Sequence, residues 1–375
     1  MPELLYKINP DRTKPWNDLP DLPLREELVE SIEVLKKLGD AKAALARLQG
    51  RSALIPNQGL LINSISLQEA KSSSAIENIF TTDDELYKAF SDQQGQVSGP
   101  SKEVLRYREA LWSGYSILNS NPVFSQGYFI RIFQEIKQTQ DGIRPAFLQT
   151  TIKKGGTDPQ AGQIIYTPPR GKGIIEKKLD NLIQFVNDDN EFPVDHLLKM
   201  AIAHFQFEAI HPFRDGNGRA GRVFNIHYLT SKGLLDFPIL YLSRYILDHK
   251  VDYYAGLEGV SQRGNWKDWM LFMLRAVEHT SKITYNKIND IVSTKDAILA
   301  HVRSEGKFQQ VTELVEFIFT QPFTKVNHLT YAGLFAEKTA RKYLNQLCDM
   351  QVLELKSIEG KHYYLNLELY RILSE

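Results

Sequence analysis

The stretch HPFRDGNGRAGR, residues 211–222, determines how the rest of the chain is interpreted. It holds three glycines, three arginines, one histidine and one aspartate, and the apolar segment 196–210 runs directly into it. Pro212 has no backbone N–H and cannot continue a helix. We therefore predict a buried helix over 196–210, a glycine loop after it, and a second helix that begins near Gly218.

The chemistry of this loop favours an anionic ligand. A helix that begins near Gly218 leaves its first N–H groups without intrahelical partners and carries a partial positive charge. Gly216 and Gly218 let the backbone approach a ligand closely, so the loop is suited to hold phosphate. Arg219 and Arg222 lie about one turn apart on roughly the same helix face. Two arginines above a phosphate site predict a polyphosphate.

Two further residues indicate group transfer. Asp215 would repel phosphates unless a cation lay between them, and Mg²⁺ is the usual one. His211 has a side chain of near-neutral pKa and can accept a proton from a hydroxyl. The loop therefore predicts transfer from a magnesium-bound nucleotide to a hydroxyl. A metal centre at His211 is a weaker alternative, because no second histidine or cysteine lies at ligand spacing; we interpret His204 as a core residue.

The composition excludes several classes of protein. The 375 residues include 45 Lys and Arg against 45 Asp and Glu, so no net charge favours nucleic acid or an anionic membrane. The single cysteine, Cys348, excludes an intrachain disulfide framework and fits a reducing compartment. No apolar run approaches the roughly 18 residues of a membrane span, and the N-terminus lacks a signal-peptide pattern. We expect a cytoplasmic protein of two or three domains.

Outward from the loop, helical spacing dominates the chain. Thr82 with Glu85 three residues later forms a capping box, which predicts a helix start. The short run Ile164-Ile165-Tyr166 lies between glycines and prolines and predicts a hairpin or flap. Helices are predicted over 25–49 (ended by Gly50), 60–80, 102–140, 176–188, 218–232 and 268–302.

The pattern changes after about residue 305. Three helical segments precede a strand–turn–strand pattern, which is the order of a winged helix-turn-helix. The segments are 311–321, 325–333 and 336–351, followed by 352–367 with its turn at Glu359-Gly360. Residues 336–365 hold five Lys or Arg against four Asp or Glu. DNA binding usually needs a clearer basic face, so protein contacts or dimerisation are slightly favoured and DNA stays open.

The motif at 211–222 matches HxF-x-[D/E]-GN-G-R-x-x-R at every defining position and resembles the signature of Fic-family proteins. The resemblance covers most of the chain. It implies a mainly α fold, with a helical Fic core, a small β-hairpin flap and a C-terminal winged helix-turn-helix domain. The implied domains are an N-terminal region 1–100 with an inhibitory helix, a catalytic core 101–285, and a linker helix with winged helix 286–375.

The resemblance also implies an activity and a set of residues. Similar bacterial proteins are adenylyltransferases that transfer AMP from ATP to a protein hydroxyl (Ser, Thr or Tyr) and release pyrophosphate. His211 would activate the hydroxyl and Asp215 would hold Mg²⁺. Gly216 to Gly218 would form the anion hole, Arg219 would bind the β- and γ-phosphates and Arg222 the γ-phosphate. The implied nucleotide-binding residues are Glu77, Phe213 (which would anchor the loop), Arg214, Asp215, Gly216, Asn217, Gly218, Arg219, Arg222, Tyr253 and Tyr254.

Residues outside the motif are expected to contribute to the same site. Tyr166, Thr167, Pro168 and Pro169 lie where the family has a flap that aligns the target segment; the alternative is an ordinary proline turn. Tyr253-Tyr254 is similar to a tyrosine pair near the adenine pocket, although such a pair is often only core. Glu208 is expected either to position His211 without contacting the substrate itself or to be a surface acid at a helix end.

The stretch SSAIEN, residues 73–78, has the pattern [S/T]-x-x-x-E-[G/N] and resembles the Fic inhibitory helix. Ser73 and Glu77 are four residues apart and can project from one helical face. A Glu77 carboxylate paired with Arg222 would occupy the place of the γ-phosphate. ATP would then bind with its phosphates turned away from the in-line geometry that transfer requires. The alternative is an ordinary helix with a surface glutamate.

The predicted function is Mg²⁺-dependent protein adenylylation that Glu77 inhibits. The expected partners are ATP, a protein substrate that includes the chain itself, and a second copy in a homodimer; no membrane is expected. Two alternatives remain open. The same site could remove AMP from modified protein while Glu77 positions a water, or the chain could be a DNA-binding regulator whose core senses a nucleotide.

Overall fold

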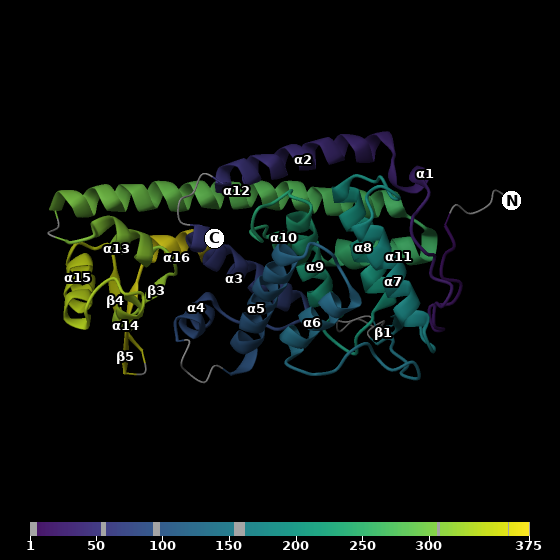
Figure 1. Cartoon of the computed structure of the whole chain (residues 1–375), viewed down its shortest axis with the longest axis horizontal. Coiled ribbons are helices and arrows are strands. Elements are labelled where there is room, and N and C mark those ends of the chain that lie inside the picture. The colour runs from purple at the N-terminus through teal and green to yellow at the C-terminus, as the bar shows by residue number, and fades with distance from the viewer. Residues whose placement is uncertain are drawn as a thin grey trace.

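The computed structural model describes residues 6–53, 58–92, 98–153, 162–305, 308–358 and 360–374. It is mainly helical, with one two-stranded hairpin and one three-stranded sheet (Figure 1). The predicted mainly α fold class is confirmed. The helices are α1 (Glu26–Val29), α2 (Ile32–Ala53), α3 (Gln58–Ile76), α4 (Asp83–Ser91), α5 (Gly99–Ser120), α6 (Gln126–Lys137), α7 (Ile174–Asn187), α8 (His196–Ile210), α9 (Asn217–Ser231), α10 (Leu242–Asp248), α11 (Lys250–Arg263), α12 (Trp266–Glu305), α13 (Val311–Ile318), α14 (Val326–Tyr331), α15 (Glu337–Asp349) and α16 (Leu367–Ser374).

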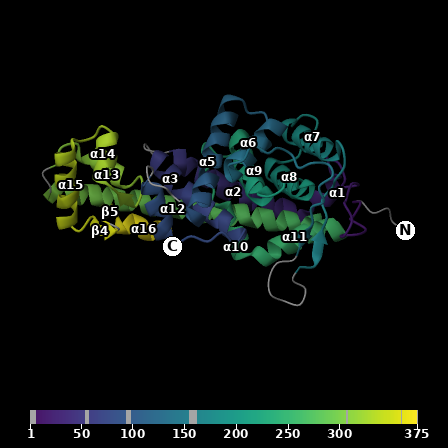
Figure 2. The ribbon, with the colours of Figure 1, turned by 90° about the horizontal axis from the view of Figure 1, so that it is seen from below.

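The longest helix, α12, runs along the molecule and joins its two ends. Helix α2 lies alongside it, and the helical core and the C-terminal domain occupy opposite ends in both views (Figures 1 and 2). Trp269, Val277 and Ile288 of α12 are fully buried. The helix crosses the predicted domain boundary at residue 285 without interruption, so no backbone break marks that boundary.

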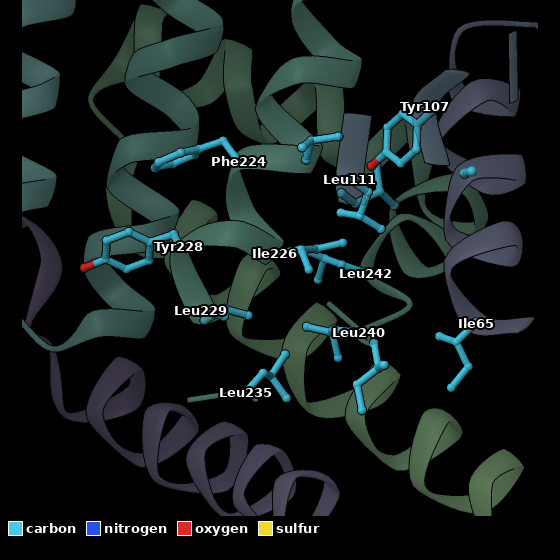
Figure 3. Packing of buried hydrophobic residues seen from close by; sticks show 14 of the residues in the cluster. Ile65, Tyr107, Leu111, Phe224, Ile226, Tyr228, Leu229, Leu235, Leu240 and Leu242 are labelled. Carbon is cyan, nitrogen blue, oxygen red and sulfur yellow. The ribbon is translucent and has the colours of Figure 1, made fainter. Parts of the chain in front are cut away.

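The centre of the core is α8 with its successor α9. As its apolar sequence predicts, nearly every residue of α8 is buried. Helix α9 is equally enclosed, and Figure 3 shows Ile226 of this helix near Leu111 of α5 and Leu229 near Leu235. Because both helices are surrounded by other helices, the loop that joins them is held rigidly from either side.

Several helices of the structure begin or end at other residues than the sequence predicts. The segment 25–49 divides into α1 and α2, and α2 continues past Gly50 to Ala53. A Cβ at Gly50 would meet nothing within 4 Å, and packing of α2 along α12 outweighs the roughly 1 kcal/mol cost of an interior glycine. The segment 102–140 divides into α5 and α6 around Pro122, which cannot continue a helix. The Thr82 capping box is confirmed.

The β structure is confined to two small sheets. Strands β1 (Ile152–Lys153) and β2 (Ile164–Tyr166) pair antiparallel and form the predicted hairpin; residues 155–161 of that prediction lie outside the described residues. The C-terminal sheet has the order β3 (Phe323–Thr324), β5 (Lys361–Leu365), β4 (Glu354–Ile358). With α13 to α15 it has the predicted winged-helix order, although Glu359 of the predicted turn is not described.

None of the described helices is both long enough and apolar enough to cross a bilayer.

Candidate active site

A cavity of about 360 Å³ lies where α8, α9 and α11 meet the β1–β2 hairpin. It brings together segments that are far apart in sequence. Of the predicted nucleotide-binding residues, Phe213 and Arg219 do not line it. Those that do are Glu77, Arg214, Asp215, Gly216, Asn217, Gly218, Arg222, Tyr253 and Tyr254, together with His211 and Glu208.

The loop between α8 and α9 is closed by its own side chains. His211 caps α8 in the left-handed conformation, with φ 51° and ψ 60°, and its N–H donates to the Phe207 carbonyl at 2.9 Å. The Asn217 side chain accepts from the Phe213 N–H and donates to the Phe213 carbonyl, both at 2.9 Å. The Asn217 amide is thereby used within the loop, and the Gly216 N–H donates to Asp215 Oδ1 at 2.6 Å. Gly216, Asn217 and Gly218 all line the cavity.

Phe213 anchors this loop from below. Its side chain is fully buried and stacks on Phe133 of α6, with ring centroids 4.3 Å apart and planes within 5°. Stacking of this kind adds to the free energy gained by burying the two rings. The predicted anchoring position of Phe213 therefore agrees with its surroundings.

A buried arginine that the sequence did not single out holds the other end of the loop. Arg144 donates from Nε to the His211 carbonyl at 2.8 Å and from Nη2 to the carbonyls of Ile210 (3.3 Å) and Pro169. Burial lowers the pKa of Arg144 to about 10. One cation thus ties the end of α8 to the segment that follows β2.

His211 is neutral at physiological pH. Burial, followed by the positive charge of Arg144, lowers the pKa of its imidazole to about 4. Its Nδ1 atom is buried without a hydrogen-bond partner. A neutral imidazole on the wall of a cavity can accept a proton.

Asp215 has a cationic partner that the sequence interpretation missed. Its side chain is 69% exposed, and Oδ2 lies 2.5 Å from Nζ of Lys137 on α6. Burial raises the pKa of the Asp215 carboxyl, but Lys137 outweighs this and leaves that pKa below its ordinary value. No set of three His, Cys, Asp or Glu side chains suited to a metal occurs in the described part of the chain. A single carboxylate fits Mg²⁺ that phosphates and water largely ligate.

The two arginines of α9 face different surroundings. Arg219 turns toward α5, where Nη1 donates to Glu103 Oε2 at 2.9 Å, and its Nε is buried without a partner. The prediction placed both guanidiniums over one ligand. In the structure only Arg222 lines the cavity, because a carboxylate from α5 holds Arg219 on the other side.

Arg222 is held by the predicted inhibitory segment. It donates from Nε to Ser73 Oγ at 2.8 Å and from Nη2 to Glu77 Oε1 at 2.8 Å. Burial raises the pKa of the Glu77 carboxyl, but the Arg222 guanidinium outweighs burial and lowers that pKa overall. Helix α3 ends at Ile76, so Glu77 lies in the turn after the helix rather than within it.

Gly218 makes room for this ion pair. A Cβ at Gly218 would overlap Glu77 Oε1 and would lie 2.9 Å from Arg222 Nη1. The close approach of a carboxylate to the start of α9 therefore depends on glycine at this position.

The tyrosine pair forms the far wall of the cavity. Tyr253 is buried and its hydroxyl lies 2.9 Å from Nε2 of His204. His204 is fully buried, as expected of a core residue, and its Nδ1 has no hydrogen-bond partner. Tyr254 is 37% exposed and packs edge-on against Tyr253 at 5.2 Å. An exposed aromatic ring beside a cavity suits the stacking of a base.

Tyr166, Thr167, Pro168 and Pro169 are all buried. The Tyr166 hydroxyl donates to the Ala209 carbonyl at 2.8 Å, and Thr167 Oγ1 donates to the Arg12 carbonyl at 2.8 Å. Tyr166 thus contacts α8 and also lines the cavity, whereas Thr167 contacts the N-terminal arm. In the described strands of this hairpin, Ile152, Ile164 and Ile165 are partly exposed and Lys153 is exposed.

Glu208 is not a surface acid. It lines the cavity, and its Oε1 is buried without a hydrogen-bond partner. Burial raises the pKa of its carboxyl to about 7.

Comparison with protein families gives three matches along the chain. Residues 35–116 match the model described as Fic/DOC family N-terminal, and residues 128–229 match that of the Fic/DOC family. Residues 294–369 match the protein adenylyltransferase SoFic-like C-terminal domain.

Individual relatives resemble parts of the chain. Protein adenylyltransferase fic-1 of Caenorhabditis elegans is 27% identical over 154 residues, which cover 39% of this chain and 28% of the relative. A probable protein adenylyltransferase of Aquifex aeolicus is 30% identical over 125 residues, covering 28% of this chain and 39% of the relative. The chain thus spans well under two thirds of the length of either relative.

Solved structures share the fold. A Fic family protein from Desulfovibrio desulfuricans superposes with a TM-score of 0.55 at 18% identity, covering 90% of this chain and 96% of that chain. Residues 134–508 of C. elegans Fic-1 superpose with a TM-score of 0.50 at 19% identity, covering 68% of this chain and 70% of that chain.

Proposed function

The chain belongs to the Fic/DOC family and has a SoFic-like C-terminal domain, and from this premise we propose that it is a protein adenylyltransferase. The names of its relatives support this activity. The observation that carries the proposal is the joint position of a neutral His211, the N–H groups at the start of α9 and Arg222 around one cavity.

The proposed reaction transfers AMP to a side-chain hydroxyl of a protein, with the chain itself among the targets. His211 accepts the hydroxyl proton, and the hydroxyl oxygen attacks the α-phosphorus of ATP. The bond from that phosphorus to the bridging oxygen breaks, and pyrophosphate leaves. The N–H groups from Gly216 to Gly218 hold phosphate oxygens, as helix N-termini do.

Asp215 is the proposed ligand of Mg²⁺. The ion would arrive with ATP and neutralise charge on the departing pyrophosphate. Asp215 already faces the cation Lys137 at 2.5 Å, so its carboxylate is ionised and aimed at positive charge. Tyr253 and Tyr254 are the proposed adenine wall, and Arg222 is the proposed partner of the γ-phosphate.

We further propose that Glu77 inhibits this transfer. Its carboxylate lies 2.8 Å from Arg222, on the guanidinium that the γ-phosphate requires. Arg222 also donates to Ser73, so three hydrogen bonds hold it against the end of α3. ATP that binds while this pair is closed has no anchor for its γ-phosphate and lies out of line for attack.

The test measures incorporation of labelled AMP into the protein itself and into lysate proteins that mass spectrometry identifies. Glu77→Gly frees Arg222 and should raise transfer at least about tenfold, equivalent to ~1.4 kcal/mol of barrier. Glu77→Gly/Arg222→Ala should lose most of this gain, because both residues act on one site.

Asn78→Gly is the matched control. Asn78 adjoins Glu77 and has φ 61°, so glycine fits its backbone, and transfer should stay at the wild-type level. Absence of transfer in Glu77→Gly, with ATP bound, would refute the activity. Equal transfer by wild type and Glu77→Gly would refute the inhibition. Faster release of AMP from modified protein by wild type than by Glu77→Gly would favour de-adenylylation instead.

A further inference from the structure

One carboxyl group in the cavity has no part in the chemistry above. Glu208 lines the cavity together with His211 and Tyr253, and its Oε1 is buried without a hydrogen-bond partner. A buried acceptor without a hydrogen-bond partner destabilises the folded protein. Such a group gains most from a ligand that brings a hydrogen-bond donor into the cavity.

The packing of α8 on α9 keeps this carboxyl in place. A Cβ at Gly221 would lie 2.5 Å from Glu208 Oε1 and 3.1 Å from Cδ1 of Phe207. Glycine at this position of α9 therefore leaves room for the carboxyl between the helices. The side chain is thus pre-positioned on the cavity wall, which lowers the entropic cost of a contact with a ligand.

The neighbours of Glu208 indicate which part of a nucleotide it faces. His211 and the N–H groups of the loop, which face phosphate in the proposed function, lie one helical turn beyond it. Tyr253 and Tyr254, which face the base, lie on its other side. His204 lies one turn before Glu208 on the same face of α8, and its Nε2 lies 2.9 Å from the Tyr253 hydroxyl, which places Tyr253 on that side of Glu208.

The sugar is the part of a nucleotide that lies between phosphate and base. The 2′ and 3′ hydroxyls of ribose are hydrogen-bond donors, and carboxylates accept from them in other nucleotide-binding folds. From these positions we propose that Glu208 binds a ribose hydroxyl and makes the site select ribonucleotides over deoxyribonucleotides. This inference rests on the proposed function, because it needs a nucleotide in the cavity.

The test compares dissociation constants of the full chain for ATP, 2′-deoxy-ATP, 3′-deoxy-ATP and 2′,3′-dideoxy-ATP by calorimetry. Wild type should bind ATP at least about tenfold more tightly than the dideoxy analogue, equivalent to ~1.4 kcal/mol. Glu208→Ala should bind both with nearly the same affinity. Glu208→Gln retains an acceptor oxygen and the side-chain shape, so it should keep part of the preference.

Glu176→Gln is the matched control. Glu176 Oε2 is also buried without a partner, but the residue lies on α7 and does not line the cavity. Its substitution should leave the ratio of ATP to dideoxy-ATP affinity unchanged. If Glu208→Ala does not fold, Glu208→Gln in the same analogue series decides the question, and a preference equal to that of wild type would overturn the inference.

Equal affinity of wild type for ATP and dideoxy-ATP, with AMP transfer intact in Glu77→Gly, would overturn this inference alone. A preference that persists in folded Glu208→Ala would also overturn it. A preference for ATP over inosine triphosphate that Glu208→Ala abolishes, without any effect of the deoxy analogues, would move the contact to the adenine amine. Failure of ATP to bind would overturn the proposed function as well.

Discussion

His211 depends on its surroundings for its protonation state. Its imidazole lines the cavity with Nδ1 buried, and the guanidinium of Arg144 donates to the His211 carbonyl at 2.8 Å. Burial and this cation act in the same direction and lower the pKa of His211 to about 4. The neutral ring is therefore the resting form over the physiological range, and it is the form that can accept a proton.

The first prediction at this scale concerns the pH dependence of transfer. The neutral form of His211 is present above its pKa, so the transfer rate of Glu77→Gly should change less than about twofold between pH 8 and pH 6, and should fall as pH drops toward 4. Rates of labelled AMP incorporation across this range measure the pH dependence of transfer.

His211→Ala should abolish transfer yet bind ATP, since the loop N–H groups and Arg222 hold the phosphates. A rate that halves near pH 6.5, or a folded His211→Ala that still transfers AMP, would contradict the assignment.

At the scale of elements, the helices around the site pack through glycines. Gly114 of α5 faces α9, where a Cβ would overlap Cε1 of His227 and would lie 2.5 Å from Cδ1 of Ile132. His227 cannot move aside, because its Nδ1 lies 2.6 Å from the Tyr128 hydroxyl and its Nε2 lies 2.7 Å from the Leu111 carbonyl. The spacing of α5 and α9 is therefore set by one residue without a side chain.

The element-scale prediction follows from that contact. Gly114→Ala should lower the free energy of unfolding by about 1–3 kcal/mol, as overpacked cores do, measured by urea denaturation. Gly39→Ala is the matched control, because Gly39 lies in the exposed face of α2 and a Cβ there meets nothing within 4 Å. That substitution should be neutral or stabilising by up to about 1 kcal/mol. Equal effects of the two changes would show that the α5–α9 contact can relax.

At the scale of the whole molecule, one segment contacts both the loop and the C-terminal domain. Ser73 and Glu77 at the end of α3 hold Arg222. The end of α4 meets the C-terminal domain, where Asp92 lies 3.0 Å from Lys325 and the Ser91 carbonyl lies 2.9 Å from Nε2 of His328. Residues 73–92 thus run from Arg222 of α9 to the C-terminal domain, with the inhibitory segment at the α9 end. DNA binding and homodimerisation stay predictions.

The free energy of unfolding should depend on pH through buried groups of the whole chain. Burial lowers the pKa of His204 to about 3 and those of His211 and His227 to about 4. A depressed histidine pKa means that stability is fully present above the unfolded pKa near 6.5 and is lost as pH falls toward the folded pKa. Burial also raises the pKa of Glu69 to about 6 and of Glu208 to about 7, which opposes the loss.

We predict a net loss of stability between pH 7.5 and pH 5, measured by urea denaturation. The contribution of His227 over this range is on the order of 2 kcal/mol, so His227→Gln should lose correspondingly less than wild type. Identical pH dependence of wild type and His227→Gln would show that His227 does not set it.

Local sequence determined the parts that depend on neighbouring residues. The all-apolar segment 196–210 predicted a buried helix, and Pro212 predicted its end. The capping box at Thr82 needs only residues three apart, and the glycines of the loop mark backbone conformations that other residues avoid. The order of helices and strands after residue 305 likewise follows from local periodicity. These features were predictable because the interactions that stabilise them join residues only a few positions apart in the sequence.

Only the tertiary structure decided which groups meet across the cavity. Arg144 reaches His211 from 67 residues away, Lys137 reaches Asp215 from 78, and Glu103 holds Arg219 from 116. No local pattern marks these partners. Lys137 and Glu103 lie on helices, where such residues usually belong to solvated faces, and Arg144 lies in the irregular segment after α6. Their pairing depends on how α5, α6 and α9 pack, and that packing brings charges together over distances in sequence that periodicity does not encode.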